Sequence, residues 1–193
     1  MKNLKRIFIA ICLYFCCLTF IFGSSKIDYL LLQLDDAIKM EAEYDRQKEE
    51  RIARLKGQLK EAVSDEDIYH LYSQLFGEYE AYICDSAMVY VKLHLQMAEK
   101  NHNTYWISEC KMRLARMYAV FARFSDAEKL LLSIPLSNLP TVPQLAAYYN
   151  RLVEVYTYWN ENASDEEVDR FIQLKNKYLD LLLTILPKDS YDY

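Results

Sequence analysis

The chain has 193 residues, of which 52% are hydrophobic and 26% are charged, with a formal net charge of −5 at pH 7. This length is enough for one domain with a substantial core. Glycine occurs only three times and proline four times, which excludes an all-β fold and leaves little room for Gly-rich catalytic loops. Apolar residues recur at helical spacing, which predicts an all-α protein.

Residues 1–25 have the pattern of a secretory signal peptide. Lys2, Lys5 and Arg6 precede an uncharged run over 7–22, and small residues follow it. The run is shorter than the roughly 18–20 residues that a membrane-spanning helix needs. We therefore expect export to the periplasm with cleavage after Ser25, and an uncleaved membrane anchor is the alternative.

The exported part is acidic. Cleavage removes three of the 23 basic residues and none of the acidic ones, which leaves 20 basic against 28 acidic residues and a net charge of −8. Such a surface repels phosphate backbones, so we expect this portion to bind no nucleic acid.

A long leading helix is predicted over 26–63. Two groups of apolar residues keep heptad spacing, and polar residues occupy the same positions between them. The first group is Ile27, Leu31, Leu34 and Ile38, the second is Ile52, Leu55 and Leu59, and the polar positions are Glu41, Asp45 and Lys48. Two interpretations follow: a solvated helix whose apolar ends pack on the rest of the protein, or a helix that dimerises.

Six further helices are predicted over 64–193, at about 66–83, 86–101, 104–122, 126–134, 143–160 and 165–186. Helix starts are marked by Ser or Thr followed three residues later by Asp, Glu or Gln, the shape of a capping box. These starts are Ser64, Ser125, Thr141 and Ser164. Asp85 or Ser86, and Asn103 or Thr104, are further candidates for caps.

The six helices form three pairs that repeat. Leu75 recurs as Leu114 and Leu152, at offsets of 39 and 38 residues. Tyr79 recurs in the same way as Tyr118 and Tyr156. Three helical hairpins of one period predict a stacked α-solenoid similar to tetratricopeptide repeats (TPR). The middle unit fits that pattern best, because small Ala115 and Ala127 allow its two helices to approach closely.

Tyrosine is the candidate for ligand contacts. The first helix of each pair lines the concave face of a TPR-like stack. Tyr69, Tyr72, Tyr148 and Tyr149 lie on such helices, before the tyrosines of the repeat pattern. Tyrosine suits interfaces because it combines apolar area with a polar tip, and it is equally common in packing between helices.

The helix at about 165–186 has two apolar stripes where a terminal helix is expected to have one. Val168, Ile172, Leu179, Leu182 and Leu186 form the first stripe, and Phe171, Leu174, Tyr178, Leu181 and Ile185 form the second. We expect an open face here through which the protein self-associates, or which a partner or a further repeat covers.

No catalytic motif is recognisable. The sequence contains no P-loop, G-x-G-x-x-G, G-x-S-x-G, C-x-x-C or H-E-x-x-H pattern. His70, His94 and His102 lack a second ligand at metal-binding spacing, so we expect no metal and no cofactor. Cys84 and Cys110 are the cysteines outside the signal, and either form one disulfide or serve as small core residues.

Three segments resemble the N-terminal region of an uncharacterised family of regulators from Bacteroidota-type bacteria. They are YDRQKEERIARLKGQL (44–59), IYHLYSQLFGEYEAYICDSAMVY (68–90) and ILPKDSYDY (185–193). The resemblance implies a signal peptide, a TPR-like periplasmic region, one transmembrane helix and a cytoplasmic coiled-coil and DNA-binding part. This chain stops at Tyr193, before the transmembrane and cytoplasmic parts, as a fragment or a natural short form.

The predicted function is therefore non-enzymatic. We expect a periplasmic sensory or protein-interaction module, the sensor part of a transmembrane transcriptional regulator, which binds a protein, a peptide or a glycan. The alternative is a structural or chaperone-like periplasmic scaffold that oligomerises through its leading helix.

Overall fold

The computed structural model describes the backbone of residues 2–187 and the side chains of residues 26–187. The predicted signal peptide therefore lies outside the residues whose side chains are described, as do the last residues of the segment 185–193. Within the described range the chain forms α-helices and one short 3-10 helix, without strands. They are α1 (Lys2–Glu61), α2 (Asp65–Glu80), α3 (Cys84–Lys100), α4 (Thr104–Val120), α5 (Phe124–Leu132), η1 (Leu136–Asn138), α6 (Val142–Glu161) and α7 (Val168–Ile185).

The chain divides into two compact units after Glu50. In the first unit, the described side chains of α1, at residues 26–50, are exposed except for the half-buried Glu43 and Lys48. Ile27, Leu31, Leu34 and Ile38 retain 52–59% of their accessible surface. Over the described residues, no helix combines the length and the apolar character that a membrane span requires.

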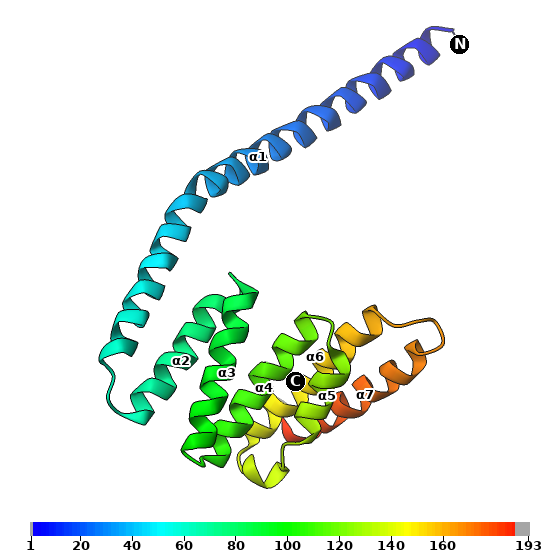
Figure 1. The fold of residues 1–193 in the computed structure, drawn as a ribbon. Coiled ribbons are helices and arrows are strands. Elements are labelled where there is room, and N and C mark those ends of the chain that lie inside the picture. The colour runs from blue at the N-terminus through cyan, green and yellow to red at the C-terminus, as the bar shows by residue number, and fades with distance from the viewer. Residues whose placement is uncertain (1, 188–193) are drawn as a thin grey trace. The chain divides into compact units, whose positions relative to one another are not determined.

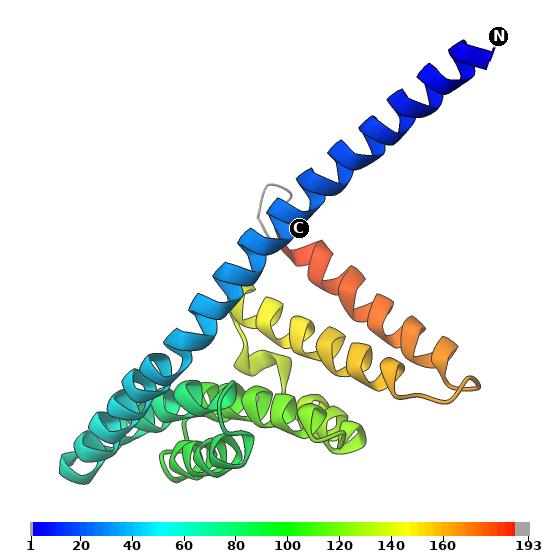
Figure 2. The same cartoon turned by 90° about the horizontal axis from the view of Figure 1, so that it is seen from above.

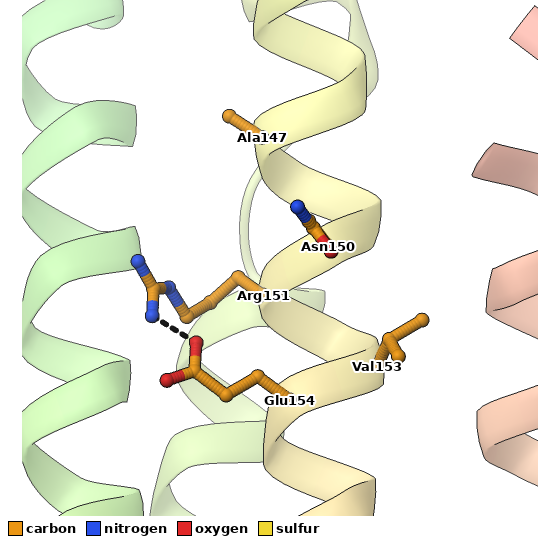
Figure 3. Close-up of a pocket in the computed structure, with 5 residues that line it drawn as sticks. All are labelled: Ala147, Asn150, Arg151, Val153 and Glu154. Carbon is orange, nitrogen blue, oxygen red and sulfur yellow. Dashed lines mark hydrogen bonds and ion pairs between the residues drawn. The ribbon is translucent and has the colours of Figure 1, made fainter. Parts of the chain in front are cut away.

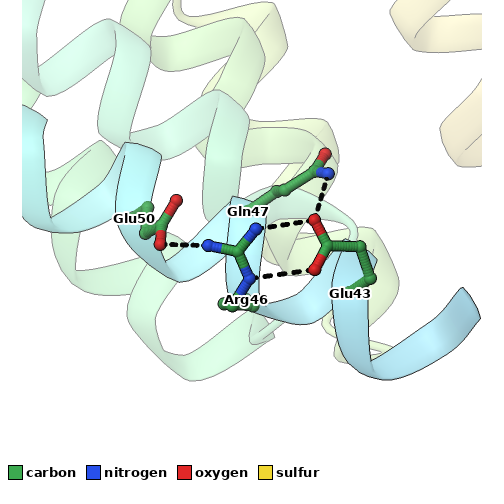
Figure 4. A network of polar contacts seen from close by, with 4 residues as sticks. All are labelled: Glu43, Arg46, Gln47 and Glu50. Atoms are coloured by element: carbon green, nitrogen blue, oxygen red, sulfur yellow. Dashed lines mark hydrogen bonds and ion pairs between the residues drawn. The ribbon is translucent and has the colours of Figure 1, made fainter.

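The polar middle of α1 is stabilised by contacts within the helix (Figure 4). Arg46 donates to Glu43, with Nη2 to Oε1 at 2.6 Å and Nε to Oε2 at 2.9 Å, and it also pairs with Glu50. Gln47 Nε2 donates to the same Glu43 Oε1 at 2.6 Å. The hydrogen bond from Arg46 lowers the pKa of Glu43 to about 2. Contacts at i,i+3 and i,i+4 explain how this polar segment stays helical.

The second unit begins at Arg51, so the last turns of α1 belong to it. Ile52 and Leu55 are 1% and 5% exposed and pack in one core cluster with Leu75 and Phe76 of α2. Arg51 donates from Nε to Glu78 Oε1 at 3.1 Å. Of the two apolar groups predicted in the leading helix, the group at 52–59 packs on the solenoid, whereas the group at 27–38 is exposed.

Helices α2 to α7 pack in consecutive antiparallel pairs, α2 with α3, α4 with α5 and α6 with α7 (Figure 1). Figure 2 shows α6 and α7 side by side and antiparallel. Helix α4 also contacts α3 and α6, which joins the pairs into one stack. The predicted all-α solenoid is confirmed.

The core follows the repeat. Leu75, Leu114 and Leu152 are 0%, 5% and 0% exposed. Leu75 and Leu114 pack in one core cluster with residues of α1 to α4, and Leu152 packs in another with residues of α4 to α7. Ala115 and Ala127 have no accessible surface, as expected where α4 and α5 approach closely.

Some of the helix caps in the structure are those predicted from the sequence. The side chain of Ser64 accepts from the Asp67 N–H at 3.0 Å, and that of Asn103 accepts from the Trp106 N–H at 3.1 Å. Thr141 forms a capping box, in which its N–H donates to Gln144 Oε1 at 3.0 Å.

Three predicted caps are wrong. Helix α5 begins at Phe124, so Ser125 already lies in its first turn, and α3 begins at Cys84, before Asp85 and Ser86. Ser164 starts a turn that precedes α7, where its hydroxyl donates to Glu167 at 2.9 Å. Phe124 and Ala87, in the first turns of two of these helices, pack in the core, and a capping-box pattern does not register such packing.

Two helix ends have a left-handed residue that is not glycine. His102 after α3 has φ of 50° and Ala122 after α4 has φ of 56°. The Arg123 N–H returns to the Tyr118 carbonyl at 2.7 Å, and the Asn103 N–H returns to the Ala98 carbonyl at 3.3 Å. These are Schellman-type turns, and they reverse the chain between neighbouring helices.

Candidate functional site

Helices α2, α4 and α6, the first helices of the three pairs, share polar side chains across one face of the solenoid. Arg113 of α4 donates from Nη1 to Ser73 Oγ of α2 at 2.7 Å. Arg116 of α4 pairs with Glu80 of α2, and its Nε lies 3.2 Å from Glu154 Oε1 of α6. We call this surface the α2/α4/α6 face.

A first polar cluster on this face is anchored by aromatic packing. Tyr69 is 2% exposed, and its ring stacks on Trp106 with centroids 3.9 Å apart. Its hydroxyl donates to Glu109 Oε2 at 2.8 Å, while Arg113 Nη2 donates to Glu109 Oε1 at 2.6 Å. Burial raises the pKa of Tyr69, so the phenol stays protonated as a hydrogen-bond donor.

A second cluster joins α4 and α6. Glu154 is shared, because its Oε1 faces Arg116 and its Oε2 accepts from Arg151 Nη1. The Arg151 side chain is only 21% exposed, and burial lowers its pKa. Its Nε is buried and has no hydrogen-bond partner among the described residues. Arg151 is thus the least satisfied cation on this face.

A pocket of about 470 Å³ opens beside Arg151. It is lined by Ala147, Asn150, Arg151, Val153 and Glu154, all from α6. Figure 3 shows that the Ala147 methyl and the Arg151 guanidinium lie on the same side of α6, whereas Val153 points the other way. A guanidinium, a carboxylate and an amide around an open space can orient a polar ligand by hydrogen bonds.

The four tyrosines proposed as ligand contacts fall into different environments. Tyr69 and Tyr148 are buried, at 2% and 5% exposed, whereas Tyr72 and Tyr149 are half-buried. Tyr148 and Tyr149 are neighbours with centroids 5.5 Å apart, and Tyr72 lies 6.4 Å from Tyr90 of α3. The four tyrosines therefore form two separate groups, one on α2 and one on α6.

The second apolar stripe of α7 mostly faces the core. Phe171 is fully buried and stacks on Trp159 at 4.5 Å, and Leu174 and Tyr178 pack against the same core cluster. Leu181 is 38% exposed, and Ile185 is half-buried. Of the residues proposed for self-association, Leu181 has the most accessible side chain, and Leu179 of the other stripe is 36% exposed.

Metal ligands do not gather within the described residues, where no group of three or more His, Cys, Asp or Glu side chains is placed to hold an ion. Cys84 and Cys110 are free thiols. Cys110 is fully buried and Cys84 is half-buried against a different core cluster, which is how small core residues pack.

Sequence reasoning did not single out Arg113, Arg116 or Arg151. One pattern could have found two of them. Arg113 and Arg151 each immediately precede the repeat leucines, Leu114 and Leu152, so the repeat itself relates the two arginines. The pairs of Arg116 with Glu80 and Glu154 could not be assigned from the sequence, because they cross between helices. The Glu109–Arg113 and Arg151–Glu154 pairs have i,i+4 and i,i+3 spacing within one helix.

These features define the class of protein as an α-solenoid of the TPR type. The chain belongs to the family described as the SusR N-terminal TPR domain, whose model matches residues 38–193. The expected resemblance to the N-terminal region of a regulator family is thereby confirmed. No match was found among curated proteins. A TPR domain is a protein-interaction module, and the chain has that general character.

Proposed function

We propose that this chain is the sensor part of a transmembrane transcriptional regulator, and that it binds a protein or peptide along the α2/α4/α6 face. Family membership supports the regulatory context. The observation that carries the choice of face is the row of six charged side chains shared between three stacked helices. They are Glu80, Glu109, Arg113, Arg116, Arg151 and Glu154.

Such a face suits recognition of an extended partner. Its arginines are already held by ion pairs, so little side-chain entropy is lost when they bind. Its charges balance, with three arginines against three glutamates, so selectivity for a partner would come from the pattern of charges and not from net attraction.

Site-specific crosslinking in intact cells tests the face. A photo-crosslinking residue replaces Asn150, which is exposed beside the pocket, and the matched control replaces Gln96, which is exposed on α3. We expect one defined partner captured from position 150 and at most weak capture from position 96. Equal capture from both positions would reject this face as the binding surface.

We propose further that the chain is exported to the periplasm. The basic start and the short apolar run of residues 1–25 support this location. N-terminal sequencing of the protein from cell fractions tests it: a start at Lys26 in the periplasmic fraction supports cleavage. A start at Met1 in the membrane fraction would instead show an anchor.

A second candidate function is a scaffold that oligomerises through the leading helix. The observation that favours it is the exposure of Ile27, Leu31, Leu34 and Ile38, at 52–59%, on a helix with heptad spacing. Leu31→Glu combined with Leu34→Glu separates the two functions. If the double variant loses both its oligomers and the capture of a partner in cells, the scaffold is favoured. Retained capture at position 150 favours the sensor.

A further inference from the structure

Arg113 and Arg151 occupy the same position of consecutive repeats, and only one of them is fully paired. Each directly precedes the buried leucine of its repeat, Leu114 or Leu152. Arg113 has two protein partners, Glu109 Oε1 at 2.6 Å and Ser73 Oγ at 2.7 Å. These partners lie four residues earlier on its own helix and on the preceding first helix.

The two positions that supply the partners of Arg113 are occupied, one repeat later, by side chains that cannot accept a strong hydrogen bond from Arg151. Ala147 stands four residues before Arg151, where Glu109 stands before Arg113. Met112 of α4 stands where Ser73 of α2 stands one repeat earlier. The guanidinium of Arg151 therefore has no partner at the two positions from which its counterpart receives a carboxylate and a hydroxyl, and the carboxylate that it contacts is Glu154.

The place of the absent carboxylate is open. Ala147 lines the pocket of about 470 Å³ together with Arg151 and Asn150. In Figure 3 the Ala147 methyl and the Arg151 guanidinium lie on the same side of the helix. A glutamate in place of this alanine would reach toward the guanidinium at i,i+4 spacing, as Glu109 does toward Arg113.

Glu154 does not fully compensate for this difference. It pairs with Arg151 through Oε2, but its Oε1 faces Arg116 at 3.2 Å. Arg151 Nε stays buried without a partner among the described residues. A largely buried cation is costly to hold unless it is well paired, so a second carboxylate beside the guanidinium would stabilise it.

We propose that the pocket beside Arg151 binds a carboxylate group of a ligand in the position that Glu109 holds beside Arg113. The guanidinium donates to the carboxylate, and the Asn150 amide, exposed at the pocket, supplies a further donor. The carboxylate belongs either to a free small acid or to a partner peptide, and the peptide origin rests on the function proposed above.

The first test supplies the carboxylate from the chain itself. In the full chain, Ala147→Glu is expected to raise the melting temperature by about 3 °C, a shift typical of one added favourable interaction in a domain of this size. Ala147→Gln, which has the same shape without charge, and Gln96→Glu, which adds a charge on α3, are the matched controls. Combining Ala147→Glu with Arg151→Gln is expected to remove the gain. An Ala147→Glu variant no more stable than Ala147→Gln would overturn the proposal.

The second test adds the carboxylate from solution. N-acetyl-L-glutamate is titrated into isotope-labelled full-length chain at constant ionic strength, with N-acetyl-L-glutamine as the neutral control. We expect saturable chemical-shift changes at Ala147 and Asn150 with the acid, and at least tenfold weaker binding to the Ala147→Glu variant. Equal responses to both compounds, or unchanged binding to the variant, would overturn the proposal.

A third arm identifies the source of the carboxylate. A peptide with one internal glutamate and an amidated end is compared with N-acetyl-L-glutamate. Tighter binding of the peptide assigns the carboxylate to a protein partner, and no gain assigns it to a small acid; both results support the site. Crosslinking from position 150 that persists when neither probe binds would overturn the carboxylate site and leave the proposed function intact.

Discussion

His94 is a buried polar residue in the core of the solenoid. It is fully buried on α3, and both ring nitrogens lack a hydrogen-bond partner among the described residues. Its ring packs on Tyr69 with centroids 4.1 Å apart, and Arg113 and His70 add to the lowering of its pKa. Burial lowers its pKa from 6.5 to about 3, so the folded protein holds this imidazole neutral.

The titration of His94 predicts a loss of stability in mild acid. Because the unfolded residue takes up a proton near pH 6.5 and the folded residue only near pH 3, stability is highest above pH 6.5 and falls as the pH drops between these values. The slope contributed is at most about 1.4 kcal/mol per pH unit. We expect urea unfolding at pH 7 and pH 5 to show this loss, and His94→Phe to reduce it. A variant with the same pH dependence as the parent would show that other groups cause the loss.

The tyrosines of the first helices are predicted to separate by their burial. Tyr69→Ala and Tyr148→Ala remove almost completely buried rings and are expected to lower the free energy of unfolding by about 3–5 kcal/mol. Tyr72→Ala and Tyr149→Ala remove half-buried rings and are expected to cost less. Denaturant unfolding measures all four, and partner capture is then informative only for the stable variants. If Tyr149→Ala costs as much as Tyr148→Ala, both are packing residues and the role of tyrosine in binding fails.

At the scale of the helical elements, the sequence does not show which residues adopt a left-handed conformation in the turns. Left-handed residues at helix ends are usually glycine, because a Cβ is unfavourable there. This chain places His102 and Ala122 at such positions, with φ of 50° and 56°. Both turns are nevertheless formed, because the helices on either side pack in the core and determine where the chain must reverse.

Ala122 offers a direct test of this strain. The residue is exposed, so Ala122→Gly removes no packing and relieves the unfavourable left-handed conformation. We expect the free energy of unfolding to rise by about 0.5–1 kcal/mol, after the entropy that glycine adds to the unfolded chain. The matched control is Ala53→Gly, in the exposed interior of α1, which is expected to lower stability by a similar amount. A loss of stability in both variants would contradict the assignment of Ala122 to a left-handed turn.

At the scale of the whole molecule, the predicted self-association would cover apolar surface on α7. Leu179 and Leu181 of α7 are 36% and 38% exposed, while Leu174 packs against the core. The predicted self-association through the end of the solenoid therefore depends mainly on the exposed pair.

Charging α7 tests that prediction. Leu181→Glu is expected to disperse an associated form with little change in melting temperature, because its side chain is partly exposed. Leu174→Glu is expected to destabilise the fold, because it places a charge against the core cluster that contains Phe171. Light scattering and thermal unfolding measure the two effects. A parent protein that stays monomeric at high concentration would reject self-association through this face.

The sequence by itself determined the helical content, the three-unit period and the burial of the repeat leucines, because these follow from local periodicity and from spacing along one chain. It also indicated the family, through three short segments that the match to residues 38–193 confirms. Caps with a polar side chain, such as Ser64 and Asn103, were predictable for the same local reason.

Only the tertiary structure decided which side chains meet between repeats. The pairing of Arg116 with Glu80 and Glu154 joins three helices, and the hydrogen bond from Arg113 to Ser73 joins α4 to α2. Likewise, Tyr69 and Tyr72 are similar in sequence context. Their different directions from the axis of α2 leave Tyr69 buried and Tyr72 half-buried. Helical periodicity determines which residues share a stripe, whereas the angle and register between packed helices determine what that stripe faces.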